Sequence, residues 1–253
     1  MRSVGLARAL SKLGYCSRSQ AQQLIRSGQV RVNGAVKRNP HAPVFLGRDR
    51  IEVNGASIHS AEKIYLMLNK PRGLVTTASD EKGRPTIYAT LYATLYATLG
   101  NNLPWVAPVG RLDKASEGLL LLTNDSDWGS QVLAPETHLP KIYHVQVSGI
   151  SDAALADALM KGVRVSNGDF LRVKDARILR QGNRNTWLAI TLDEGKNRHI
   201  RRMLEQVGVE VLRLVRVAIG PLMLGDLAKG ASRPLTPAEK SELDGAMHNP
   251  APG

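Results

Sequence analysis

The sequence has a single cysteine, Cys16, among its 253 residues. One thiol excludes an internal disulfide and a metal cluster built on several cysteines, and it fits the reducing cytoplasm. No apolar run approaches the roughly 20 residues that cross a membrane. The N-terminus also lacks an apolar signal segment with a cleavage site. We therefore expect a cytoplasmic protein without a membrane segment.

Glycine-rich phosphate loops are missing as well. Neither the dinucleotide-binding pattern nor the P-loop pattern occurs, and the sequence contains no motif of metal-ligand residues. We therefore expect no cofactor and no metal. The hydrophobic fraction of 43% supports a real core, and the length suits one large domain or two smaller ones.

Acidic residues are scarce relative to basic ones. The chain has 34 Lys and Arg against 22 Asp and Glu, which gives a net charge of +12. Residues 1–60 alone hold ten of the basic residues and two of the acidic ones, a net charge of +8. Such asymmetry favours a segment that meets a polyanion, most simply nucleic acid. The alternative is a basic surface that is only solvated.

The basic N-terminal segment has the pattern of a small module of two helices and short strands. Leu6, Leu10 and Leu13 recur at helical spacing, and Gly14 ends that helix. Ser17 and Gln20 form a capping box for the second helix. Two alternating segments then run into the turns Asn33-Gly34 and Asn54-Gly55.

The second part of the chain is organised around residues 110–125. Leu119 to Leu122 is too short a run for a free-standing helix, so it reads as a strand buried on both faces. The polar loop before it carries Asp113 between Arg111 and Lys114. A carboxylate flanked by cations stays ionised and suits a nucleophile. The alternative is a surface ion pair with Arg111.

Two later segments complete the candidate site. Residues 141–147 alternate as a strand, with Tyr143 and Val145 on one face. Residues 194–203 lead into an amphipathic helix with basic residues at its start, a composition that fits a phosphate site. Arg201 adjoins the buried stripe of that helix. Tyr143 alone would read as a core aromatic.

Two other segments leave alternatives open. Lys70 and Arg72 follow an apolar strand at residues 64–68, and they either touch RNA or belong to a solvated turn. Residues 88–99 repeat Tyr-Ala-Thr-Leu three times, which places the tyrosines along one helical face. A duplicated unit that lengthens a helix is our interpretation of this repeat, and base stacking by the tyrosines is the alternative.

These motifs together resemble a known family. Gly-Arg-Leu-Asp followed by Ser-Glu-Gly-Leu-Leu-Leu-Leu-Thr-Asn-Asp is similar to the active-site motif of pseudouridine synthases that modify ribosomal RNA. The Lys-x-Tyr at residues 141–143 and the basic helix start resemble that family's later motifs. The first 60 residues resemble the S4 RNA-binding domain.

The resemblance implies a role for each site residue. Asp113 would be the catalytic carboxylate, and Arg201 would pair with it and keep it charged. Tyr143 would pack against the target base, with Ile219 beside the base pocket. Arg111 would fill the space left by the extracted nucleotide. The expected RNA contacts are Arg8, Lys12, Arg18, Arg26, Lys196 and Arg198.

We therefore expect an α+β protein with an S4-like RNA-binding domain at residues 1–60 and a synthase domain at residues 61–245. The synthase domain would have a mixed, largely antiparallel sheet flanked by helices, followed by a disordered tail at 246–253. The implied reaction is isomerisation of a uridine to pseudouridine, without a cofactor, by a monomer acting on ribosomal RNA or an assembly intermediate.

Several alternatives remain at this point. The large-subunit RNA is favoured, with the small-subunit RNA as the alternative. A non-catalytic S4-type RNA-binding or ribosome-assembly protein is a further possibility, although Asp113, Tyr143 and Arg201 are all present. An RNA methyltransferase with an S4 domain would need a glycine-rich loop after residues 64–68, and none follows there.

Overall fold

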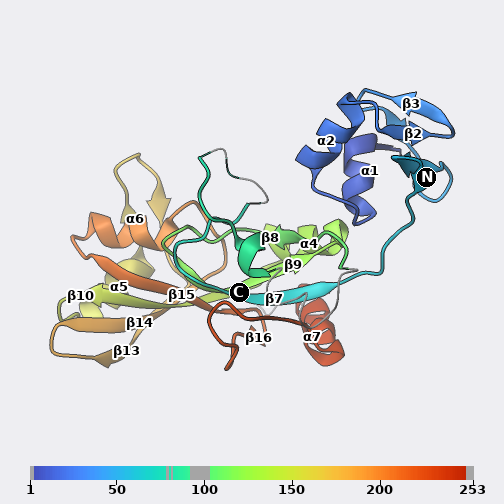
Figure 1. The fold of residues 1–253 in the computed structure, drawn as a ribbon. Helices are drawn as coiled ribbons and strands as arrows, with labels where there is room; N and C mark the ends of the chain where they lie inside the picture. The colour runs from blue at the N-terminus through green and yellow to red at the C-terminus, as the bar shows by residue number, and fades with distance from the viewer. Residues whose placement is uncertain (1–2, 78–79, 81, 92–102, 249–253) are drawn as a thin grey trace.

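The computed structural model describes residues 3–77, 80, 82–91 and 103–248. They form a small N-terminal unit and a larger unit built on one long sheet, which are joined through the segment before β7 (Figure 1). Within these ranges no helix is both long enough and apolar enough to cross a membrane.

The N-terminal unit forms because two short amphipathic helices cover a small sheet. The elements are α1 (Leu6–Lys12), α2 (Arg18–Arg26), β2 (Val30–Val32), β3 (Ala35–Lys37), β5 (Ile51–Val53) and β6 (Ala56–Ser57), with the sheet order β3-β2-β5-β6. A separate pair joins β1 (Val4–Gly5) to β4 (Pro43–Val44). The predicted capping box is present, since Ser17 and Gln20 exchange hydrogen bonds at the start of α2. Leu6, Leu10 and Ile25 are fully buried in this unit's own core.

The larger unit is built on a nine-stranded sheet, and the predicted mixed, largely antiparallel pairing is confirmed. Its main order is β13-β14-β10-β15-β9-β7-β17, with β16 on β15 and β8 on β9. The strands are β7 (Tyr65–Lys70), β8 (Ala107–Val109), β9 (Glu117–Thr123), β10 (Lys141–Ser148), β13 (Asp175–Gln181), β14 (Asn185–Leu192), β15 (Val211–Ile219), β16 (Leu222–Met223) and β17 (Ser232–Pro234). Only β9 and β15 pair in parallel among the described strands.

Helices cover both faces of this sheet. They are α4 (Ser126–Leu133), α5 (Ala153–Lys161), α6 (His199–Gln206) and α7 (Pro237–His248), with a short 3-10 turn η1 (Pro135–Thr137) and a small hairpin of β11 (Val163–Arg164) and β12 (Phe170–Leu171). Residues of α5 and α6 belong to one core cluster and residues of α4 and α7 to another. Strand β9 supplies both, Leu120 and Leu122 to the first and Leu119 and Leu121 to the second. The leucine run is therefore a strand buried on both faces, as its composition predicted.

Gly118 is required by the parallel contact between β9 and β15. Its φ is +102°, and a Cβ placed there would lie 2.2 Å from the carbonyl oxygen of Arg216. Such an approach is possible only for a residue without a side chain. The glycine therefore lets the strand after the Asp113 loop lie directly against β15.

The two units touch through α1 and the loop that follows it. The Ala61 amide donates to the Leu13 carbonyl at 3.1 Å, and the Trp105 amide donates to the Gly14 carbonyl at 2.8 Å. Lys12 forms an ion pair with Asp127 on α4 at 2.9 Å. Lys12 therefore contacts a carboxylate of the larger unit, and its contact with RNA stays a prediction.

Two further predictions can be compared with the structure. The disordered tail was predicted too early, because α7 continues through His248 and Met247 is buried. In the repeat, Tyr88 is buried, and its hydroxyl donates to the Val106 carbonyl at 2.8 Å. A core role for this first tyrosine agrees with the helix interpretation. Tyr92, Tyr96 and residues 249–253 lie outside the described residues.

Candidate active site

A pocket of about 400 Å³ opens where the loop before β9 meets the start of α6. Strands β10 and β15 form its floor. Apolar side chains of Leu112, Leu192, Ile200 and Leu214 line part of its wall. The predicted residues Arg111, Asp113, Tyr143, Lys196, Arg198 and Arg201 all line it. Residues that are far apart in the sequence therefore meet in one cavity.

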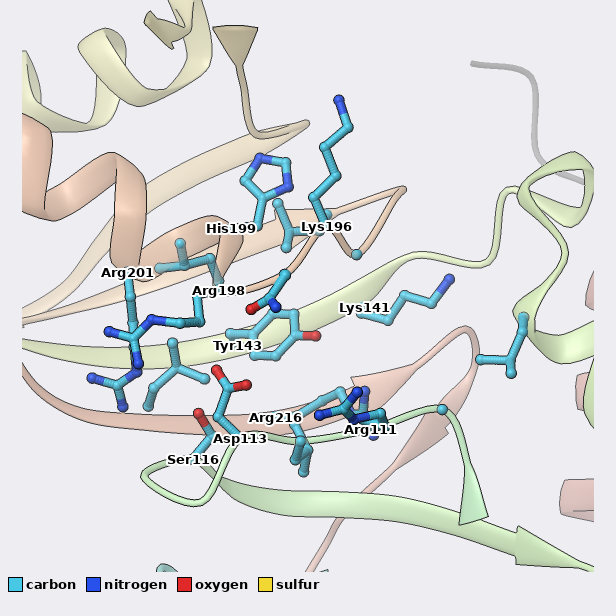
Figure 2. Close-up of a pocket in the computed structure, with 18 residues that line it drawn as sticks. Arg111, Asp113, Ser116, Lys141, Tyr143, Lys196, Arg198, His199, Arg201 and Arg216 are labelled. Carbon is cyan, nitrogen blue, oxygen red and sulfur yellow. The ribbon is translucent and has the colours of Figure 1, made fainter. Parts of the chain in front are cut away.

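The Asp113 carboxylate points into this pocket, toward the ring of Tyr143 (Figure 2). The loop that carries it is held in place by hydrogen bonds to its backbone carbonyl groups. The Ser116 amide donates to the Asp113 carbonyl at 2.9 Å, and the Gly73 amide donates to the Lys114 carbonyl at 2.7 Å. The Thr76 hydroxyl also donates to the Leu112 carbonyl at 2.8 Å. The carboxylate is thus presented by a rigid loop, as catalytic geometry requires.

Lys70 is the main support of this loop, and the sequence did not reveal it. Neither of the two interpretations offered above is correct, because its side chain is fully buried. Its ammonium group donates to the carbonyl oxygens of Pro71, Asp113 and Ser116 at 3.1, 3.2 and 2.9 Å. A buried ammonium group with three acceptors is satisfied without a carboxylate contact. Lys70 therefore ties the end of β7 to both sides of Asp113.

This burial gives a pH dependence that can be measured. Burial lowers the pKa of Lys70 from 10.5 to about 8, although the charges of Asp113 and Glu117 oppose that change. Between these two values the unfolded chain binds more protons than the folded one, so stability rises with pH. The variant Lys70→Met lacks this titrating group. We expect the free energy of unfolding of the wild type to rise, relative to that of Lys70→Met, by up to about 3 kcal/mol between pH 8 and pH 10.5.

Denaturant unfolding of both proteins across this range measures the effect. The exposed Lys161, at the end of α5, offers the control Lys161→Met, which should follow the wild type at every pH. Parallel stability curves for wild type and Lys70→Met would contradict the buried, titrating lysine.

Tyr143 lies on β10 with only 8% of its surface exposed. Its ring faces Asp113 across the pocket (Figure 2). The alternation predicted for this strand is present, since Tyr143 and Val145 lie in one core cluster. The position suits an aromatic wall against which a base can pack.

Arg201, on α6, shares the pocket with Asp113 but is not in direct ion-pair contact with it. Its guanidinium group donates to the carbonyl oxygens of Ala115 at 3.0 Å and Val211 at 3.4 Å. Burial lowers the pKa of Arg201, the charge of Arg198 adds to this, and the charge of Asp113 opposes it. No ion pair among the described residues includes Asp113. Arg201 and Asp113 therefore interact only through the attraction between their charges, without a hydrogen bond or ion pair between the two side chains.

The start of α6, which was predicted to form a phosphate site, has a more varied arrangement of side chains. Arg198 precedes the helix in the left-handed conformation, with φ of +52°, and its side chain is exposed. Lys196 is also exposed and pairs with Glu194 at 3.1 Å. His199 is buried and its Nε2 contacts the Arg172 carbonyl at 3.0 Å, which makes it a structural residue.

Ile219 does not belong to this site. It packs in the core cluster on the other face of the sheet, with Met67 and Leu243. A bulge interrupts β15 here, since Tyr143 pairs with Arg216 and Ile142 with Ala218, so its core neighbours, and not simple alternation, define the face of Ile219. The pocket instead receives Leu214 and Arg216 from this strand, and Lys141 from β10. The sequence offered no signal for Arg216 other than its alternation with the apolar residues of the strand.

The other predicted RNA contacts lie on the N-terminal unit. Arg8, Arg18 and Arg26 are exposed on α1 and α2, whereas Lys12 is engaged by Asp127. The three arginines are free to meet an anionic partner.

Comparison with known proteins agrees with this arrangement. The model of the family described as RNA pseudouridylate synthase matches residues 64–206, and the S4 domain model matches residues 4–47. The fold and the matches define an RNA-modifying isomerase with an added RNA-binding module. The chain belongs to the RNA pseudouridylate synthase family.

Individual relatives cover nearly the whole chain. The ribosomal large subunit pseudouridine synthase B of Bacillus subtilis is 35% identical over 240 residues, covering 94% of each chain. An uncharacterized RNA pseudouridine synthase of Aquifex aeolicus is 37% identical and covers 96% of this chain and 94% of its own. A crystal structure of a pseudouridylate synthase matches with a TM-score of 0.63 and 28% identity, covering 95% of this chain and all of that one. The predicted family and fold class are confirmed.

Proposed function

We propose that this enzyme isomerises a specific uridine of large-subunit ribosomal RNA in the cytoplasm, with Asp113 as its catalytic carboxylate. The observation that carries the catalytic assignment is the position of Asp113. Its carboxylate faces Tyr143 in a pocket with apolar walls, on a loop clamped by Lys70. Cationic side chains from four different segments line the same pocket.

The chemistry of the reaction explains this arrangement. The bond between N1 of uracil and C1′ of the ribose must break, the base must turn, and a bond from C5 to C1′ must form as the C5 proton leaves. An ionised carboxylate can start this reaction at the sugar, and an enclosed wall keeps the detached base. The nucleotide must also leave its stack to reach the pocket. Asp113 supplies the carboxylate, Tyr143 the wall, and Arg111 a side chain at the pocket mouth that can occupy the vacated position.

The ribosomal substrate is supported by the Bacillus subtilis relative, whose name specifies the large ribosomal subunit. Mapping pseudouridines in ribosomal RNA from cells with and without this gene tests the proposal directly. We expect one site in the large-subunit RNA to lose its pseudouridine and to regain it when the gene is restored. A loss in the small-subunit RNA alone, or no loss at all, would contradict it.

The N-terminal unit is expected to supply much of the RNA affinity. Deleting residues 1–60 removes a net charge of +8, so we expect weaker RNA binding with a smaller salt dependence. The larger unit should still fold, because the N-terminal core cluster contains no residue beyond position 58. Filter binding at several salt concentrations, together with thermal melting, measures both effects.

A full-length variant separates loss of charge from loss of the contact between units. In Arg8→Gln/Arg18→Gln/Arg26→Gln the ion pair of Lys12 with Asp127 is retained. The slope of log affinity against log salt should fall by about two, at roughly 0.7 for each phosphate contact of single-stranded RNA. An unchanged slope in both proteins would show that the N-terminal unit does not bind the RNA backbone.

A further inference from the structure

Two cations on the pocket floor have no assigned role in the site as described so far. Arg216 lies on β15, directly opposite Tyr143 of β10 in the sheet register, and Lys141 lies two residues before Tyr143. Both side chains line the pocket. Arg216 is only 6% exposed, although it carries a full positive charge.

The hydrogen bonds of Arg216 are incomplete. Its Nε donates to the Leu119 carbonyl at 2.7 Å, which fixes the guanidinium plane against β9. Its Nη2 is buried and has no hydrogen-bond partner. Buried polar groups are normally satisfied, and an unsatisfied charged donor is especially unfavourable. The free donor therefore indicates a missing partner.

Lys141 is half-buried beside it and has few partners in the protein. The only hydrogen bond of its ammonium group to a described residue is a long one, 3.5 Å, to the Asp193 carbonyl. Burial lowers the pKa of Lys141, and the charge of Arg216 lowers it further, while Asp193 opposes this. Asp193 itself pairs with Lys174 at 3.5 Å. Within the described part of the chain, neither Lys141 nor Arg216 forms an ion pair.

Two like charges that lie together on a half-enclosed floor, with no ion pair to a described carboxylate, are stabilised by a bound anion. Uracil is neutral and cannot supply that charge. The phosphates of an RNA strand can. Figure 2 shows Lys141 and Arg216 on one side of Asp113, together with Arg111, and Arg198 and Arg201 on the other.

We propose that Lys141 and Arg216 form a binding site for one phosphate group adjacent to the target uridine. This inference rests on the proposed function, since it places the target sugar at Asp113. A ribose whose C1′ reaches Asp113 carries a phosphate on either side, and one of them lies over the floor cations. Arg216, fixed by Leu119, provides a guanidinium charge with an unpaired Nη2, a group that suits phosphate oxygens. Lys141 adds the second charge.

The test compares uridine, uridine 3′-monophosphate and uridine 5′-monophosphate as ligands of the full-length protein. Dissociation constants are measured by NMR titration for the wild type, for Lys141→Met and for the surface control Lys161→Met. In the wild type we expect one of the two nucleotides to bind about tenfold more tightly than uridine. Lys141→Met should remove this preference and leave uridine binding unchanged, whereas Lys161→Met should retain it. Inorganic phosphate should compete with that nucleotide in the wild type.

Three results would overturn the proposal. In the first, the wild type binds all three ligands equally. In the second, the preference persists in Lys141→Met, which places the phosphate elsewhere. In the third, Lys141→Met weakens uridine as much as the nucleotide. Arg216→Lys, which keeps the charge but not the guanidinium group, should reduce the preference severalfold. Turnover on ribosomal RNA is measured separately, so a failure of the proposed function is distinguishable from a failure of the phosphate site.

Discussion

The variant Asp113→Asn is expected to bind RNA and to melt like the wild type, and to show no detectable isomerisation. The amide has nearly the shape of the carboxylate but cannot act as an anionic nucleophile or base. The loop should keep its conformation, because its bonds to Ser116 and Lys70 use the backbone carbonyl of residue 113. Tritium released from C5-labelled uridine in RNA measures the turnover directly.

A matched control is Asp157→Asn, which removes the same charge from the exposed surface of α5. It should keep full activity. If Asp113→Asn retained activity within about tenfold of the wild type, Asp113 could not be the catalytic group, since losing an essential nucleophile removes far more.

The variant Gly118→Ala is expected to abolish folding of the larger unit at ordinary temperatures. The added methyl carbon would lie 2.2 Å from the Arg216 carbonyl oxygen and 2.8 Å from the Arg216 amide nitrogen. Both are backbone atoms, so relief requires that β9 and β15 separate. A strained backbone conformation alone costs about 1–3 kcal/mol, and the overlap adds to it. The sum approaches the whole stability of a domain, about 5–15 kcal/mol.

Gly149→Ala is the control that separates these two contributions. Gly149 also has a positive φ, +79°, but a Cβ added at this position would have no atom within 4 Å. We expect this variant to fold with a modest loss of melting temperature. Circular dichroism and thermal melting of both variants check the prediction. Equal losses would show that conformation, and not the contact with β15, is what Gly118 provides.

The sequence was most informative where composition and spacing reflect burial. The leucine run of β9, the capping box at Ser17 and the Asp113 loop could each be interpreted from local pattern, and the family motif added their order. Ile219 was misplaced because a bulge between Arg216 and Ala218 interrupts the alternation of β15, and neither the residue pattern nor the motif reveals that bulge. The protein partners of Lys70 and Lys12 could not be predicted for another reason. Their partners, the carbonyls around Asp113 and the carboxylate of Asp127, come together only in the tertiary fold.

The parallel contact between β9 and β15 also bears on how the protein folds. It joins Glu117 to Val215 and Gly118 to Arg216, pairs separated by about half the length of the larger unit. Contacts between distant residues slow folding, because a long loop must close before the contact stabilises it. During synthesis the Asp113 loop therefore emerges long before the strand that completes its pocket. A nascent chain that ends before β15 can present the aspartate loop and a complete N-terminal unit, whose core cluster ends at Ile58, yet have no enclosed site. The catalytic pocket is therefore among the last parts of the enzyme to be completed during synthesis.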